Sequence, residues 1–253
     1  MNKLQVVQLK YLKRILHAPS STTNCVTFLE LGILPIEFSI NINQLQFLHH
    51  ILTLEDDDPV KTAYNQQKLF PYEKNWYNEV ITLRSKYGLT QTDSEIAELS
   101  KDKWKSQVKT AVIELALEYL NNENSEKTKT CHLPVYTALQ PQKYFEYLPP
   151  ADSRLLFSIR SGTLDIKTFR KYNYTDGDTL CRLCGEADET IEHIVNQCKD
   201  VRRSYHVENI FTDQKDEVEV VVSRVRDFIK ISEEREEKDD AEETEDHPLK
   251  ELQ

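Results

Sequence analysis

Four residues with metal-binding side chains lie close together in the segment CRLCGEADETIEHIVNQC, in the last third of the sequence. They follow a C-x2-C-x8-H-x4-C pattern and are Cys181, Cys184, His193 and Cys198. Two thiols three residues apart can hold one tetrahedral ion from a tight turn, and Gly185 relaxes the backbone at that turn. Three thiolates and one imidazole complete a four-coordinate shell and leave no position for a catalytic water. The pattern therefore predicts a structural Zn²⁺ site.

Short local elements must position these ligands. Residues 188–197 are expected to form a helix that carries His193 and has Ile191, Ile194 and Val195 on its apolar side. Cys198 follows His193 by five residues, which is about 140° around an ideal helix. We therefore expect Cys198 at or just past the helix end, where the chain can bend back.

Basic and aromatic residues alternate in the approach to the metal cluster. Residues 153–174 carry five cations against Asp165 alone, a local charge of +4. Cations neutralise phosphates, and exposed rings stack on unpaired bases. The predicted contacts to RNA or DNA are Arg154, Arg160, Lys167, Arg170, Lys171, Tyr172 and Tyr174, joined by Arg182, Arg202 and Arg203 around the metal. The alternative is that the rings belong to a core and the cations are only solvated.

Motifs for catalysis are missing from the sequence. It contains no phosphate-binding P-loop, no dinucleotide-binding glycine pattern, no G-x-S-x-G and no H-E-x-x-H. The run Asp56–Asp58 lies in a polar break that ends at Pro59, which is typical of a solvated loop. We therefore expect that this chain is not an enzyme.

Composition and charge indicate a helical protein with an acidic end. Only 5 of the 253 residues are glycine, which favours helices joined by polar loops, so the fold class is expected to be mostly α. The net charge is −11, of which residues 232–253 carry −8, and this composition predicts a disordered acidic tail. An acidic balance opposes non-specific binding to phosphates. It keeps open a second function, a protein-interaction module in which zinc only staples helices.

The two remaining cysteines, Cys25 and Cys131, are far apart and are expected to be buried thiols without a disulfide. A chain with free thiols fits a reducing compartment, the nucleus or the cytoplasm. Residues 1–29 contain no acid, so a mitochondrial presequence is a less favoured alternative. The sequence contains no run of 18 apolar residues, so we expect no membrane-spanning helix.

Helical periodicity and its breaks define the expected elements. The predicted helices are residues 2–17, 26–31, 36–52, 60–69, 75–87, 93–121 with a break near Ser100, 151–161, 163–172 and 214–231. In the first helix the apolar stripe is Leu4, Val7, Tyr11 and Ile15, widened by Leu12 and Leu16. The expected regions are 1–122, a helical region; 123–150, a linker; 151–231, with basic helices, the metal cluster and a final helix; and 232–253, the tail.

Three stretches of the chain resemble the C-terminal part of a non-LTR retrotransposon reverse transcriptase. They are LQVVQLKYLKRILHAPSSTTNCVTFLELGILPIEFSININQLQFLHHIL, similar to the thumb and post-thumb helices, then IRSGTLDIKTFRKYN, and CRLCGEADETIEHIVNQC, similar to the family's C-terminal zinc knuckle. The resemblance spans about residues 1–203. It implies a multi-helix thumb-like bundle with a small CCHC zinc-knuckle module, whose flanking basic residues hold template RNA or target DNA.

The sequence departs from this family's pattern at its catalytic parts. The aspartates of the palm, which bind the polymerase metals, are absent, and so is the fingers region. No endonuclease motif follows the knuckle. The resemblance therefore implies a non-catalytic fragment, either an element remnant or a host gene derived from one.

Overall fold

The computed structural model describes residues 3–70, 74–169, 178–201 and 205–245, and these residues form a mostly α-helical protein. Eleven helices and no β-strand occur in this described part of the chain, which confirms the expected fold class. The chain folds into two compact units. The first unit comprises Met1–Arg14, Asn24–Lys127 and Val135–Pro141, and the second comprises Ile15–Thr23, Thr128–Pro134 and Gln142–Gln253.

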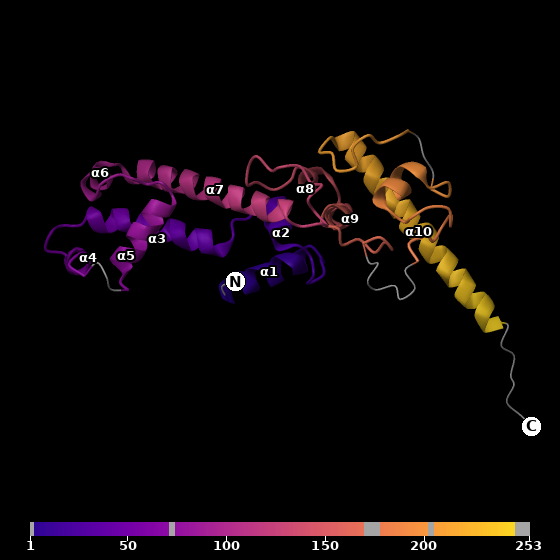
Figure 1. Ribbon diagram of the computed structural model, residues 1–253, viewed down its shortest axis with the longest axis horizontal. Helices are drawn as coiled ribbons and strands as arrows, with labels where there is room; N and C mark the ends of the chain where they lie inside the picture. The colour runs from indigo at the N-terminus through magenta and orange to yellow at the C-terminus, as the bar shows by residue number, and fades with distance from the viewer. Residues whose placement is uncertain (1–2, 71–73, 170–177, 202–204, 246–253) are drawn as a thin grey trace, which may run out of the picture. The chain divides into compact units, whose positions relative to one another are not determined.

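The core of the first unit lies between two long helices, α3 and α7, which run alongside each other (Figure 1). The helices that build this unit are α1 (Lys3–Ile15, whose last residue groups with the second unit), α2 (Asn24–Leu31), α3 (Ile36–Leu52), α4 (Pro59–Gln67), α5 (Trp76–Lys86), α6 (Asp93–Glu98) and α7 (Lys101–Ser125). Trp104 of α7 is buried against α3, and its indole Nε1 donates a hydrogen bond to the carbonyl of Leu45 at 2.8 Å. This bond satisfies the one polar group of the ring inside an otherwise apolar interface.

Four helix boundaries lie where local sequence signals predict them, whereas α7 and α10 run past their predicted ends at 121 and 231. Pro35 immediately precedes α3, and Gly32 follows α2 with a φ of 61°. Thr92 forms a capping box with Glu95 at the start of α6. Ser100 caps α7 through its side chain, which confirms the expected break near this residue.

The rotation of α1 differs from the prediction. Leu4, Val7, Tyr11 and Ile15 are all exposed, whereas Leu12 and Leu16, which widen the predicted stripe, are buried together with Leu9. The side chain of Gln8 bonds α1 to the chain around the start of α3, because its Nε2 donates to the carbonyl of Leu34 at 3.0 Å and its Oε1 accepts from the backbone N–H of Ile36 at 2.8 Å. The helix carries apolar residues on two faces, and these hydrogen bonds are compatible with burying only one of them.

The second unit is built around one long helix, α10 (Lys215–Glu245), against which the shorter helices pack. These shorter helices are α9 (Pro150–Arg160) and a π-helix, η1 (His193–Gln197). The bounds of α9 confirm the helix predicted at 151–161, and a short helix, α8 (Tyr144–Tyr147), precedes it. The buried core of this unit includes Ile159, Ile166, Ile194, Val225 and Phe228 together with Cys181 and Cys198. The cysteine cluster is therefore part of a larger hydrophobic core.

The helix predicted at 163–172 in the second unit is wrong over its described residues, and so is the disordered tail predicted from 232. Residues 163–169, the described part of the helix expected at 163–172, form irregular chain with a bend at 164–165 and a turn at 167–169. The backbone N–H of Lys167 donates to the carboxylate of Glu189 at 3.0 Å, and the hydroxyl of Thr168 donates to the Glu189 carbonyl. Gly162 follows α9 with a φ of 64°, and the chain after it combines short-range backbone hydrogen bonds with these bonds to Glu189 in place of a helical ladder.

Residues 232–245 belong to α10 and are not a disordered tail. Ser232 is buried and donates to the carbonyl of Phe228, and Arg235 donates to the carbonyl of Leu183 at 2.6 Å. The segment is rich in Glu, Lys and Arg, which are good helix formers. Once the contacts of Ser232 and Arg235 fix its first turn, the helix can continue through the rest of it. The remainder of the predicted tail, 246–253, lies outside the described residues.

The segment 123–150 is not a free linker. In the first unit, the hydroxyl of the buried Tyr136 donates to the carboxylate of Glu30, and the side chain of Asn121 bonds to the Tyr136 backbone. In the second unit, Leu133 and Tyr144 are buried.

No single described helix has the length and apolar composition to cross a membrane; α2 and α3 meet that test only as a pair bent by 61°.

Candidate metal centre

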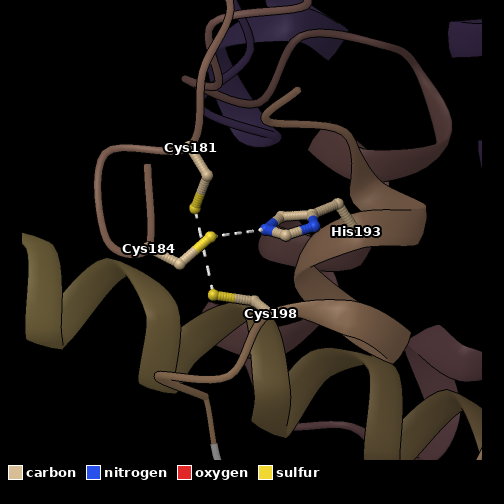
Figure 2. A group of neighbouring side chains, drawn as sticks. All are labelled: Cys181, Cys184, His193 and Cys198. Atoms are coloured by element: carbon tan, nitrogen blue, oxygen red, sulfur yellow. Dashed lines mark hydrogen bonds between the residues drawn. The ribbon is translucent and has the colours of Figure 1, made fainter. Parts of the chain in front are cut away.

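The four predicted ligands come together in the second unit. The ligand atoms of Cys181, Cys184, His193 and Cys198 all lie within 4.8 Å of one another. Figure 2 shows the three sulfur atoms and the imidazole converging on one point. The sulfur atoms of Cys181 and Cys198 are 3.9 Å apart, and the sulfur of Cys184 is 3.3 Å from Nε2 of His193. The sequence spacing therefore identified a real cluster.

A tight turn presents the first two ligands. The backbone N–H of Gly185 donates to the carbonyl of Cys181 at 2.8 Å, and the backbone N–H of Cys181 donates to the carbonyl of Ala187 at 2.7 Å. Gly185 has a φ of 65°, in the left-handed region that glycine enters without steric cost. The expected role of Gly185 at this turn is confirmed.

A π-helical turn presents the other two ligands. The backbone N–H of Cys198 donates to the carbonyl of His193 at 2.7 Å, which is the i to i+5 bond of a π-helix. In this wider turn Cys198 comes about one full turn after His193, so the two side chains lie on the same side. In an ideal α-helix they would be about 140° apart. The hydroxyl of Thr190, three residues earlier, accepts from the backbone N–H of His193 at 3.0 Å and so holds the start of this turn. Helix geometry thus brings Cys198 back beside His193.

The site is buried, and burial acts on its thiols. Cys181, His193 and Cys198 are at most 4% exposed, while Cys184 is half-buried. Burial raises the pKa of Cys181, and it raises the pKa of Cys198 to about 12, with the neighbouring Cys181 and Cys184 adding to the effect. Burial also disfavours the Cys184 thiolate, but backbone N–H donors such as that of Glu186 outweigh it, so the Cys184 pKa is lowered.

The distances fit a tetrahedral metal ion. Zinc bonds of about 2.3 Å to sulfur and about 2.0 Å to nitrogen separate neighbouring ligand atoms by about 3.5–3.8 Å. Two of the observed separations, 3.9 Å and 3.3 Å, lie close to this range, and all four ligand atoms lie within 4.8 Å of one another. Nε2 of His193 faces the thiols, and its Nδ1 is buried without a hydrogen-bond partner among the described residues. The chain thus holds a buried Cys3His group that could bind a metal ion such as zinc.

Arg160 is not available to nucleic acid in this structure, contrary to the prediction. Its side chain is fully buried. Its Nη1 donates to the carbonyl of Phe211 at 3.1 Å and lies 3.4 Å from the carboxylate of Asp213. The sequence could not distinguish this buried arginine from a surface cation, because these partners lie more than 50 residues away in the chain.

Two further predicted nucleic-acid contacts are engaged in ion pairs within the unit. Lys167 lies 2.5 Å from the carboxylate of Asp178. Arg182 binds the carboxylate of the fully buried Glu189, with the closest approach at 2.6 Å. Both cations are thereby largely neutralised by protein carboxylates.

Arg154 remains half-exposed beside an open depression of 630 Å³ in the second unit. The depression is lined by residues 16–19, by the first turns of α9 and by residues 163–165. His17 contributes to the same surface with a φ of 51°. The other predicted contacts lie outside the described residues; they are Arg170, Lys171, Tyr172, Tyr174, Arg202 and Arg203.

Of the two cysteines outside the cluster, Cys25 is buried as expected, and burial raises its pKa to about 11. Cys131 is exposed, so the expectation of a buried thiol is wrong there. Sequence reasoning also missed Glu189, whose carboxylate lies at the centre of the contacts behind the metal turn. No sequence signal separates it from the nearby acids Glu186, Asp188 and Glu192.

No protein-family model, no curated protein and no solved structure matches the chain. The chemistry of the centre therefore rests on its own geometry. What that geometry establishes is a mostly helical protein with a buried Cys3His group suited to a metal ion.

Proposed function

We propose that Cys181, Cys184, His193 and Cys198 bind one Zn²⁺ ion and that this ion has a structural role. The observation that carries the proposal is the convergence of four soft or borderline ligand atoms within 4.8 Å of one another. Three thiolates with one imidazole are a ligand set typical of closed structural zinc sites. When bound, zinc would cross-link the turn at 181–185 to the π-helical turn at 193–198.

The surrounding contacts support a structural ion over a catalytic one. Four protein ligands leave no coordination position for a substrate or a water. The centre is embedded in the core that includes Ile194, Val195 and Phe228, so the cross-link would stabilise the packing against α10. This favours a binding module that is not an enzyme.

Cobalt substitution tests the ligand set directly. A tetrahedral Co²⁺ site with three thiolates gives strong visible and near-ultraviolet absorption, and one equivalent of Zn²⁺ should abolish it. Cys184→Ser should lower the thiolate absorption and shift the visible bands, because only two of the three thiolates remain, whereas Cys131→Ser, which changes an exposed cysteine outside the cluster, should leave the spectrum unchanged. Identical spectra for Cys184→Ser and the wild type would contradict the proposed ligand set.

A second proposal concerns the partner: the zinc-organised unit binds RNA or DNA without catalysing a reaction. The resemblance to the C-terminal region of a retrotransposon reverse transcriptase supports this proposal. So does the local charge of +4 in residues 153–174, with Arg154 half-exposed beside the 630 Å³ depression. The burial of Arg160 and the pairing of Lys167 and Arg182 narrow the surface that is free to meet phosphates.

Fluorescence anisotropy with labelled structured RNA and duplex DNA tests this partner. Binding by zinc-loaded protein should weaken as salt rises, since each phosphate contact releases a counterion. A variant with Arg154→Ala, Arg170→Ala and Tyr172→Ala should bind more weakly and with a salt slope smaller by about 2. Lys230→Ala, which removes an exposed cation from α10, is the matched control.

The absence of binding by folded, zinc-loaded wild type at low salt would contradict the nucleic-acid proposal and leave the zinc proposal intact. The alternative would then be a protein-interaction module stapled by zinc. That alternative is favoured by the net charge of −11, which repels nucleic acid.

A further inference from the structure

A fully buried carboxylate lies directly behind the metal turn. Glu189 is 0% exposed and is five residues from Cys184 and four from His193 in sequence. An ionised carboxylate removed from water is costly unless charged and polar donors surround it. Glu189 also lies in sequence between the two ligand pairs, so the groups that stabilise its charge belong to the surroundings of the metal centre.

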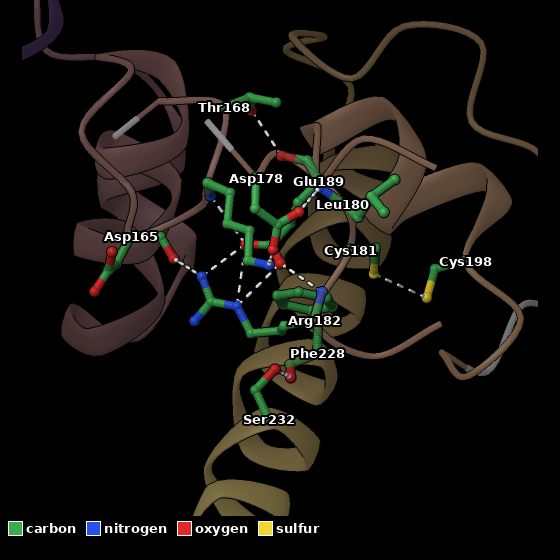
Figure 3. Close-up of polar contacts among 11 residues, drawn as sticks. Asp165, Thr168, Asp178, Leu180, Cys181, Arg182, Glu189, Cys198, Phe228 and Ser232 are labelled. Atoms are coloured by element: carbon green, nitrogen blue, oxygen red, sulfur yellow. Dashed lines mark hydrogen bonds and ion pairs between the residues drawn. The ribbon is translucent and has the colours of Figure 1, made fainter. Parts of the chain in front are cut away.

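The contacts of the Glu189 carboxylate come from two segments of the described chain (Figure 3). Oε1 accepts from the Lys167 backbone N–H at 3.0 Å, and Oε2 accepts from the Arg182 backbone N–H at 2.9 Å. The guanidinium of Arg182 donates from Nε to both oxygens, at 3.1 and 3.0 Å, and from Nη2 to Oε1 at 2.6 Å. The Glu189 side chain therefore holds both the backbone and the side chain of Arg182, the residue that follows Cys181.

The backbone of Glu189 extends this anchorage. Its N–H donates to the carbonyl of Thr179 at 2.7 Å, and its carbonyl accepts from the hydroxyl of Thr168 at 2.6 Å. On the other side of the pair, Nη2 of Arg182 also donates to the carbonyl of Asp165 at 3.2 Å. Residues 165–168 and 179–182 are thus tied to a single point.

The pair also faces α10. The guanidinium carbon of Arg182 lies 5.8 Å from the centre of the Phe228 ring, within the range of a cation–π contact. Arg235 of the same helix donates to the carbonyl of Leu183, between the two cysteines of the turn. These contacts fix the backbone of residues 182 and 183, and that backbone sets the directions in which Cys181 and Cys184 point.

We infer that Glu189 is a positioning residue of the metal centre, which acts through Arg182 to hold the Cys181–Cys184 turn in ligand geometry before the ion binds. The inference rests on the proposed zinc function. A ligand turn that is already ordered loses less conformational entropy on binding, so its affinity for the ion is higher. Arg182 belongs to this centre, and its guanidinium is not free to bind a phosphate.

The test compares three substitutions in the full-length protein, with and without zinc. Glu189→Gln keeps the size of the side chain but removes the charge that Arg182 neutralises. Arg182→Lys keeps the positive charge but loses the planar fork, and it serves as the second variant if Glu189→Gln does not fold. Glu186→Gln is the matched control, because it breaks the exposed pair between Glu186 and Lys199 in the same loop.

Two quantities are measured, the zinc dissociation constant by competition with a chromophoric chelator and the rise in Tm that zinc produces. Loss of an outer-shell contact typically weakens metal binding about 10- to 100-fold. Glu189→Gln and Arg182→Lys should weaken binding by about 10-fold or more and reduce the zinc-dependent rise in Tm. Glu186→Gln should bind zinc within about 2-fold of the wild type, since exposed ion pairs contribute little.

The outcomes separate the two claims. A wild type that does not bind zinc overturns the proposed function itself. A wild type that binds zinc, with variants of Glu189 and Arg182 that bind it equally tightly, overturns only the inference. A purely structural role would lower Tm equally with and without zinc and leave the dissociation constant unchanged, and this result too would overturn the inference.

Discussion

Among single residues, Gly185 shows how closely the metal turn depends on its backbone. Its φ of 65° lies in the left-handed region, and a Cβ added there would meet nothing within 4 Å. We predict that Gly185→Ala costs about 1–2 kcal/mol, all of it from backbone strain, and weakens zinc binding because the Cys181–Cys184 turn opens. Chemical unfolding and a zinc competition assay measure the two effects.

Gly88 provides the control for this prediction. It has a φ of 64° and equally open space at its Cβ position, but it follows α5 in the first unit. Gly88→Ala should cost a similar amount of stability and leave zinc affinity unchanged. Equal zinc affinities for Gly185→Ala and the wild type would show that the turn does not depend on this glycine.

The sequence revealed the four residues of the candidate metal centre but not the residues that support them. Cysteine and histidine at fixed spacing carry a local signal, so Cys181, Cys184, His193 and Cys198 could be assigned from the sequence. The role of Glu189 depends on Lys167 and Arg182 folding around it, and no local pattern encodes that arrangement. The prediction for Arg160 was wrong for the same reason, because its burial involves residues beyond 210.

Among elements, the helix boundaries were predictable where a local signal defines them. Pro35, Thr92 and Ser100 each stand at the start of a helix, and Gly32 follows the end of α2. The face that a helix buries was not predictable for α1, since apolar residues lie on two of its sides. Hydrogen bonds from Gln8 to Leu34 and Ile36 accompany that rotation, and bonds to Glu189 accompany the non-helical chain at 163–169.

Asp93 is the electrostatic link among α4, α5 and α6 in the first unit. Its carboxylate lies 2.8 Å from Nζ of Lys68 and 2.9 Å from Nη1 of Arg84, and it accepts from the hydroxyl of Tyr64 at 3.0 Å. Burial raises the pKa of Asp93, but the hydrogen bonds from Lys68 and Tyr64 and the charge of Arg84 outweigh it, so the pKa lies below 3.8. The folded state therefore favours the ionised form.

This shift gives a signed prediction for pH. Because the folded-state pKa is lowered, the stabilisation is fully present above pH 3.8 and is lost as the pH falls through the folded-state value. Asp93→Asn should cost about 1–3 kcal/mol at pH 7, and its difference from the wild type should shrink below pH 4. Urea unfolding at several pH values measures this, and a difference that stays constant from pH 7 to pH 3 would contradict it.

For the whole molecule, the division into two units predicts where metal removal acts. The first unit has its own core, which includes Leu45, Trp104 and Val108 and contains no residue of the cysteine cluster. We predict that chelation, or Cys184→Ser, makes residues 178–201 sensitive to protease while the core helices of the first unit stay protected. Limited proteolysis with mass mapping distinguishes the two regions, and unchanged cleavage of 178–201 after zinc removal would argue against a structural role.

Native mass spectrometry of protein produced in zinc-supplemented medium tests most directly whether the four clustered residues hold one structural zinc ion. We predict one zinc per chain in the wild type and in Cys131→Ser, and loss of that zinc in Cys184→Ser and in His193→Ala. A wild-type chain without zinc, or a Cys184→Ser, His193→Ala double variant that retains a full equivalent, would contradict it.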